Sequence, residues 1–183
     1  MAKKTMNALH YLIHTSAYYF SWIACIALAA RGYAWISSFI VLTCVGLQLY
    51  WQHKTGRTLK GLWLLLTIVV LTSTLIDNAL VYTKTVIYSA NPFSASFTPP
   101  WMISLWISFT VFLYATLSDL FNHLFLLGFF SCIGFTLAFR IGESLGAVSF
   151  PYGSNITCLF IGILWSIGLP FCVYCFQKIK ENK

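Results

Sequence analysis

Six apolar stretches, each long enough to cross a lipid bilayer, take up almost the whole of this 183-residue chain. About 20 consecutive apolar residues span the hydrocarbon core as a helix. These stretches leave no room for a soluble domain. We therefore expect an all-α, polytopic membrane protein, a single domain over residues 1–183 formed by a six-transmembrane-helix bundle with short loops. The expected spans are residues 9–30, 34–51, 62–82, 101–120, 124–144 and 156–176.

Composition supports this interpretation. Hydrophobic residues make up 59% of the chain and charged residues 8%, and the formal net charge is +7. The basic residues lie between the apolar stretches, where they can contact anionic lipid headgroups, and they form no basic face that could follow a nucleic acid. We expect membrane lipids as partners, another membrane protein or a second copy of the chain as a further partner, and no nucleic acid.

The distribution of basic residues predicts the orientation in the membrane. With six spans, both termini share one side with the second and fourth loops. That side holds eight basic residues, namely Lys3, Lys4, Lys54, Arg57, Lys60, Lys178, Lys180 and Lys183. The other side holds three, Arg31, Lys84 and Arg140. Positive residues collect on the cytoplasmic side of membrane proteins, so both termini are expected in the cytoplasm.

Asp77 is the ionisable residue that lies deepest inside an apolar stretch, and a carboxylate there needs a partner. Asp77 and Arg140 each lie roughly 23 Å along spans that run in the same direction. We therefore predict a buried pair between them. Glu143, three residues from Arg140, is the competing partner, and Arg140 could instead extend to the headgroups.

If the chain binds a ligand, we expect the site near this pair, close to the outward loops at residues 83–99 and 149–155. Asn78 adjoins Asp77, although it points about 100° away around the helix. Trp101 and Trp106 are candidate walls of such a cavity, although interfacial anchoring is the favoured role for Trp101. The alternative is that the pair of Asp77 and Arg140 only stabilises the bundle and that no cavity exists there.

Two weaker patterns accompany this site. Small residues recur every four positions at Gly134, Ala138, Gly142 and Gly146, which predicts close packing of that helix against a neighbour. A set of potential metal ligands is spaced i, i+4 at the cytoplasmic ends of two spans, and it consists of His10, His14, Asp119 and His123. Interfacial histidines explain this set better, because the chain lacks repeated histidine boxes. No metal and no other cofactor is predicted.

Four segments resemble a known family. They are Trp22 in the first span, Leu75–Asp77, Pro100–Trp106 with the sequence PWMISLW, and Gly142–Val148 followed by Phe150 and Pro151. In order and spacing, over residues 21–151, these segments resemble the bacterial integral-membrane family called domain of unknown function 2878. The resemblance implies a multi-pass protein of the bacterial inner membrane and supplies no reaction.

The chain departs from the family pattern at two places. Family members carry Asn-His in the fourth span, where this chain has Tyr114-Ala115, and Gly before the Asp, where it has Ser73-Thr74. If the Asn-His pair performs chemistry, this chain lacks it.

Three functions are therefore open. The first, which we favour, is a non-enzymatic membrane partner or scaffold linked to envelope lipid metabolism. The second is a small-solute or lipid transporter, with Asp77 and Arg140 lining the pathway. The third is a membrane-embedded, metal-dependent lipid-modifying enzyme that uses the histidine set.

Overall fold

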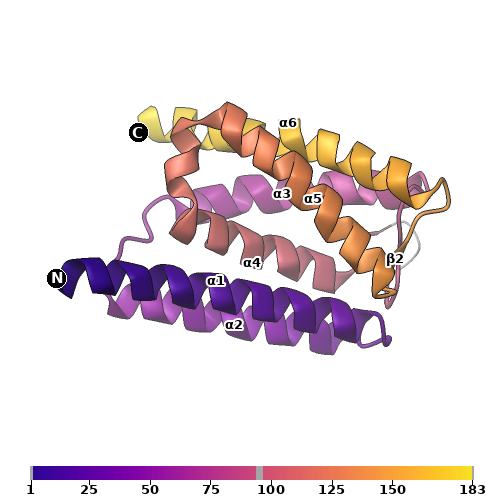
Figure 1. Cartoon of the computed structure of the whole chain (residues 1–183), viewed down its shortest axis with the longest axis horizontal. Coiled ribbons are helices and arrows are strands. Elements are labelled where there is room, and N and C mark those ends of the chain that lie inside the picture. The colour runs from indigo at the N-terminus through magenta and orange to yellow at the C-terminus, as the bar shows by residue number, and fades with distance from the viewer. Residues whose placement is uncertain (1, 94–96, 183) are drawn as a thin grey trace.

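The structure, a computed structural model, describes residues 2–93 and 97–182. Six α-helices fill it, and they are α1 (Ala2–Ala29), α2 (Ala34–Lys54), α3 (Leu62–Tyr82), α4 (Pro100–Thr116), α5 (Leu124–Ser144) and α6 (Ser154–Glu181). The helices run up and down between two ends of one bundle (Figure 1). We call the end where α1 begins and α6 finishes the terminal end, and the opposite end the loop end.

The bundle places apolar side chains on its surface and many polar ones inside. Phe39, Phe125 and Ile156 are 72%, 86% and 74% exposed, respectively. Ser21 and Ser108 meet between α1 and α4 with their hydroxyl oxygens 3.3 Å apart. This inverted distribution suits a hydrocarbon solvent, in which buried polar groups must be satisfied within the protein. Five of the helices are long and apolar enough to cross a membrane, so the structure is that of a membrane protein.

α4 is the shorter, central helix. Its 17 residues pack against α1, α2 and α3. We expected a span over residues 101–120, but α4 ends at Thr116 and Ser118–Asn122 forms a 3₁₀ helix, η1. Ser, Asp and Asn side chains compete for backbone hydrogen bonds and favour such turns. The early end of α4 leaves α5 to start beside α6, away from α1 (Figure 1).

A short β-ladder closes the loop end, which the expectation of plain loops did not include. β1 (Ile87–Tyr88) pairs antiparallel with β2 (Val148–Ser149), with Tyr88 opposite Val148. Gly146 has a φ of 82°, a conformation that favours glycine, and it turns the chain from α5 into β2. The connection between α3 and α4 is therefore tied to the connection between α5 and α6.

Close helix packing occurs at glycines other than the predicted ones. A Cβ at Gly162 of α6 would lie 2.6 Å from the Cys132 carbonyl oxygen of α5. A Cβ at Gly128 of α5 would lie 2.6 Å from the Ser166 carbonyl oxygen of α6. Pro170 has no N–H to donate to that Ser166 carbonyl, which is therefore free to approach α5. These two glycines bring α5 and α6 together.

The predicted small-residue stripe does not form this contact. A Cβ at Gly134 would meet nothing within 4 Å, and Gly146 lies beyond the end of α5. A four-residue spacing identifies a helix face but not what covers that face. The stripe instead borders a cavity between α1, α4 and α5.

Candidate functional site

Asp77 lies fully buried in α3 and points toward α4 rather than toward lipid. Its Oδ2 accepts a hydrogen bond of 2.7 Å from the indole Nε1 of Trp106. Its other oxygen, Oδ1, has no partner within 3.5 Å among the described residues, and the nearby Tyr88 hydroxyl interacts with this carboxylate from a longer distance. An indole N–H is therefore the partner that a buried carboxylate requires.

Trp106 is the centre of an aromatic cluster that joins four helices. Its ring centroid lies 4.3 Å from that of Trp165 in α6 and 5.3 Å from that of Phe135 in α5. Phe135 and Trp165 are themselves 5.2 Å apart. The hydrogen bond to Asp77 adds α3, so this cluster fixes α3, α4, α5 and α6 relative to one another.

The β-ladder covers the loop-end side of this cluster. Tyr88 of β1 is 5% exposed and packs edge-on against Trp101, with ring centroids 5.5 Å apart. Burial first, and the neighbouring Asp77 carboxylate second, raise the pKa of Tyr88 well above its usual value. Trp101 is buried and donates to the Ser89 carbonyl at 3.2 Å. The interfacial role considered for Trp101 is therefore wrong.

The predicted pair of Asp77 with Arg140 is wrong. Arg140 forms an ion pair of 2.6 Å with Glu143, the competing partner, and its side chain is 52% exposed. Glu143 also accepts a hydrogen bond from Ser154 at the start of α6. The depth of a residue along a helix does not fix the direction in which it points, and Arg140 faces outward. Asn78 accepts two hydrogen bonds from Thr98, at 2.7 and 2.8 Å, and so anchors the connection between α3 and α4.

An apolar cavity lies between α1, α4 and α5. α5 packs mainly against α6 and diverges from α1 toward the terminal end (Figure 1). The space so formed has a volume of about 390 Å³. A smaller cavity of about 60 Å³ continues it toward the loop end. The two cavities share five lining residues, Tyr18, Trp22, Phe109, Phe135 and Ala138. We call the two together the lateral groove.

The wall of the lateral groove includes the small-residue stripe. Gly134 and Ala138 line the larger cavity, and Ala138 and Gly142 line the smaller one. Small side chains on α5 therefore keep the groove open, where we had expected them to close a helix contact. Trp106 and Tyr88, the neighbours of Asp77, line the smaller cavity. Asp77 itself lines neither.

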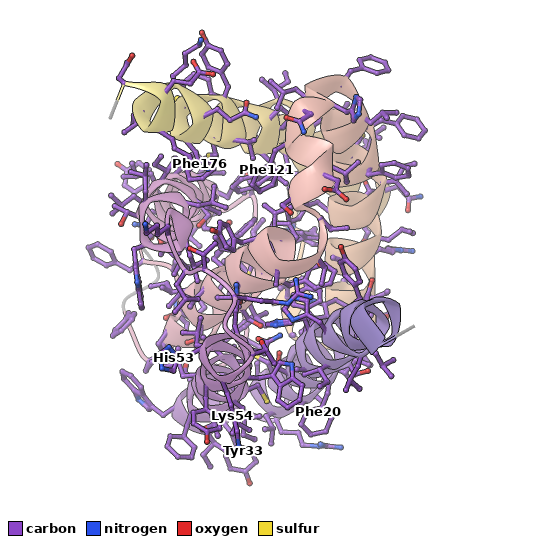
Figure 2. All side chains as sticks on the ribbon, turned by 90° about the vertical axis from the view of Figure 1, so that its left-hand side faces the viewer. Phe20, Tyr33, His53, Lys54, Phe121 and Phe176 are labelled. Carbon is purple, nitrogen blue, oxygen red and sulfur yellow. The ribbon has the colours of Figure 1, made fainter. Side chains whose placement is uncertain are left out.

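A second cavity, of about 660 Å³, opens at the terminal end. We call it the polar cavity. It lies between the starts or ends of α1, α2, α4 and α6, with η1 at one edge, where Phe121 and Phe176 meet (Figure 2). Its polar lining residues are His10, Tyr11, Gln52, Arg57, Thr58, Tyr114, Ser118, Asn122, Gln177, Lys180 and Glu181.

The predicted histidine set is only partly brought together. The rings of His10 and His14 lie 4.3 Å apart on α1, and both residues are buried. Asp119 and His123 are exposed near η1 and do not line the polar cavity. Across the described residues, no group of three or more His, Cys, Asp or Glu side chains is arranged to hold a metal ion. The geometry thus gives no support to a metal centre built from these four residues.

Buried polar atoms without partners surround the polar cavity. His10 and Gln52 are 2% and 3% exposed. Nδ1 of His10 and Oε1 of Gln52 have no hydrogen-bond partner in the described part of the chain. The Gln52 amide is held in place because its Nε2 donates to the Thr58 carbonyl at 3.3 Å. Buried polar atoms rarely remain unpaired, so these atoms are available to a ligand.

Comparison with models of protein families gives a match over most of the chain. The family described as "Protein of unknown function (DUF2878)" matches residues 11–171. The chain belongs to the DUF2878 family. Searches of curated proteins and of solved structures find no match to this DUF2878 chain.

The DUF2878 segments identified in the sequence meet in space. Asp77 ends one segment and accepts the hydrogen bond of Trp106, which ends another. Val148 ends a third and pairs with Tyr88 beside them. Trp22, Trp106 and Val148 all line the smaller cavity of the lateral groove. Three of the four segments that carry the resemblance therefore contribute residues to the lining of this groove.

Several site residues were not identified from the sequence. The groove aromatics Tyr18, Phe109 and Phe135 look like any other aromatic residue of an apolar span. Gln48 and Gln52 did carry a signal, because two amides spaced i, i+4 near the end of an apolar span need polar neighbours. Tyr114, at the position of the family's Asn-His, donates its hydroxyl to the Lys60 carbonyl at one edge of the polar cavity.

Proposed function

We propose that this DUF2878 protein is a non-enzymatic, lipid-binding membrane protein that holds the hydrocarbon chain of one bilayer lipid in the lateral groove and serves as a partner in envelope lipid metabolism. The observation that carries the proposal is the open, aromatic-lined groove between α1 and α5. Its larger cavity of about 390 Å³ falls within the range of small-molecule sites, roughly 300–1,000 Å³.

The dimensions of the groove favour a lipid chain over a helix of a partner protein. A transmembrane helix with its side chains is about 10 Å in diameter and would need far more room than this cavity offers. The walls are half-buried aromatic and small residues, such as Trp22, Phe109 and Ala138. They provide mainly apolar contact, which suits a hydrocarbon chain.

The membrane setting is part of the proposal. We propose that α4 crosses as the sixth span, since it lies at the centre of the bundle and η1 extends it at the terminal end. Seven of the ten basic residues that the structure describes lie at the terminal end. This distribution supports an orientation with both termini in the cytoplasm and, for a bacterial member of the family, location in the inner membrane.

The test is to fill the groove without disturbing the fold. In Gly134→Leu, the new side chain enters the groove, where a Cβ meets no atom within 4 Å. Gly46→Leu is the matched control, because Gly46 is an exposed helical glycine of α2 with equally open surroundings. Native mass spectrometry of the proteins purified in mild detergent measures the lipid that remains bound.

Wild type and Gly46→Leu are expected to retain one lipid per chain. Gly134→Leu is expected to retain about tenfold less, because overpacking of a filled site costs about 1–3 kcal/mol. Equal retention by Gly134→Leu and Gly46→Leu, with both variants folded, would contradict lipid binding in the groove. Copurification of a protein that Gly134→Leu alone releases would instead assign the groove to a protein partner.

A further inference from the structure

We infer that the polar cavity binds the headgroup of this lipid, and that the headgroup is an anionic phosphodiester that carries free hydroxyl groups. The inference rests on the proposed function and adds the class of lipid to it. Three observations carry it: the position of the cavity relative to the lateral groove, the charges of its lining residues, and its unpaired buried atoms.

The polar cavity and the lateral groove share no lining residue among those that the structure describes, but neighbouring positions of α1 and η1 line the two. Tyr18 and Trp22 line the groove from one face of α1, and Tyr11, two turns nearer the terminal end on that face, lines the polar cavity. The 3₁₀ helix η1 also contributes to both cavities, since Leu120 lines the groove and Phe121 lines the polar cavity. We therefore place the headgroup of an amphiphile whose chain lies in the groove in the neighbouring polar cavity.

The lining charges favour an anion. Arg57 and Lys180 are the cations of the lining, and Glu181 is its acid among the described residues. The Glu181 carboxylate is engaged by Lys178 at 2.9 Å. Arg and Lys side chains are the groups that hold phosphate oxygens in proteins, so an anionic phosphodiester suits a lining that carries Arg57 and Lys180.

The unpaired buried atoms require a hydrogen-bond donor on the headgroup in addition to its negative charge. Oε1 of Gln52 is a buried acceptor, and a phosphodiester has no hydrogen to donate to it. A hydroxyl group on the headgroup supplies that donor. Nδ1 of His10 is also buried and unpaired, and it can donate a hydrogen bond to the headgroup or accept one from its hydroxyl group, depending on the tautomer of the ring. Glycerol attached to the phosphate has this combination of charge and hydroxyls.

The experiment compares lipids that have the same acyl chains. Phosphatidylglycerol has both charge and hydroxyls, phosphatidylethanol has the charge alone, and phosphatidylcholine has neither net charge nor hydroxyls. Native mass spectrometry of the full chain measures the retention of each from equimolar mixtures. Free glycerol 3-phosphate, tested by thermal shift, distinguishes a lipid headgroup from a soluble phosphate compound.

We expect wild type to prefer phosphatidylglycerol over phosphatidylcholine by about tenfold, the typical effect of a hydrogen bond to a charged group. Arg57→Gln and Lys180→Gln are expected to remove most of this preference. Lys54→Gln is the matched control, because it removes a charge from the exposed end of α2, outside the lining of the polar cavity (Figure 2). If Lys54→Gln lost this preference to the same extent, the preference would come from the general surface charge of the protein, and the assignment of the headgroup to the polar cavity would be overturned.

A separate comparison tests whether the headgroup carries a free hydroxyl group. Wild type is expected to prefer phosphatidylglycerol over phosphatidylethanol by roughly twofold to tenfold, the range for a neutral hydrogen bond. Gln52→Leu is expected to abolish this second preference and to leave the preference for anionic lipid intact. Equal retention of the two anionic lipids by wild type would overturn the hydroxyl assignment.

The outcomes separate this inference from the proposed function. Lipid retention that depends on Gly134 but shows no headgroup preference would leave the groove assignment standing and overturn the headgroup assignment. A chain that retains no lipid would contradict both. Stabilisation by glycerol 3-phosphate without retention of phosphatidylglycerol would show that the polar cavity binds a soluble phosphate compound, which also overturns the assignment.

Discussion

Asp77 shows how far a single residue can be interpreted from sequence. Its position in an apolar span predicts burial and a partner, and it is buried and hydrogen-bonded. The identity of that partner was not predictable, because Asp77 and Arg140 have similar depths but their side chains point in different directions. Arg140 finds Glu143 three residues along its own helix, a pairing that needs no tertiary structure.

At the residue scale, the Asp77–Trp106 hydrogen bond is expected to stabilise the bundle. Trp106→Phe removes the donor and leaves the buried carboxyl group without its partner. We expect the free energy of unfolding to fall by about 1–2 kcal/mol beyond the loss of ring contacts, in line with hydrogen bonds between transmembrane helices. Reversible denaturation in mixed micelles measures this change.

Trp165→Phe is the matched control, because Trp165 is buried in the same cluster while its Nε1 has no partner among the described residues. It should lose ring contacts only. When Asp77 is already replaced by Leu, Trp106→Phe should lower the free energy of unfolding by no more than Trp165→Phe does. A cost of Trp106→Phe that is unchanged by Asp77→Leu would show that the hydrogen bond contributes nothing measurable.

At the scale of helices, the sequence indicates which residues are small but not which helix faces meet. The periodic stripe of α5 and the isolated Gly162 of α6 both satisfy the general rule that small residues permit close approach. Only Gly162 has a neighbouring helix against it. The difference arises from the rotation of α5 about its axis, which is set by the whole of its contact with α6.

This difference predicts opposite effects of the same substitution. Gly162→Ala places a Cβ 2.0 Å from Thr136 Oγ1 and 2.6 Å from the Cys132 carbonyl oxygen. The hydroxyl can rotate away but the carbonyl cannot, so stability should fall by about 1–3 kcal/mol. Gly134→Ala meets no atom and should be neutral or stabilise by up to about 1 kcal/mol, since Ala favours helix. Equal destabilisation by the two substitutions would contradict the described packing of α5.

At the scale of the whole molecule, hydropathy was sufficient to predict an all-helical membrane protein. Helices occupy each of the six expected segments, although α4 is shorter than expected. The β-ladder between the two loops and the lateral groove were not predictable. Both depend on segments distant in sequence, such as Tyr88 with Val148 and Trp22 with Phe135. No local pattern encodes such a contact, and none encodes the divergence of α5 from α1.

The most direct test of the central claim, that the lateral groove holds a lipid chain, is a crystal structure determined in a lipidic mesophase. We predict continuous hydrocarbon density between α1 and α5, running from Trp22 past Gly134 to Leu120 and ending at the polar cavity. A structure in which α5 closes onto α1, so that the chain's own side chains fill this space, would contradict the account.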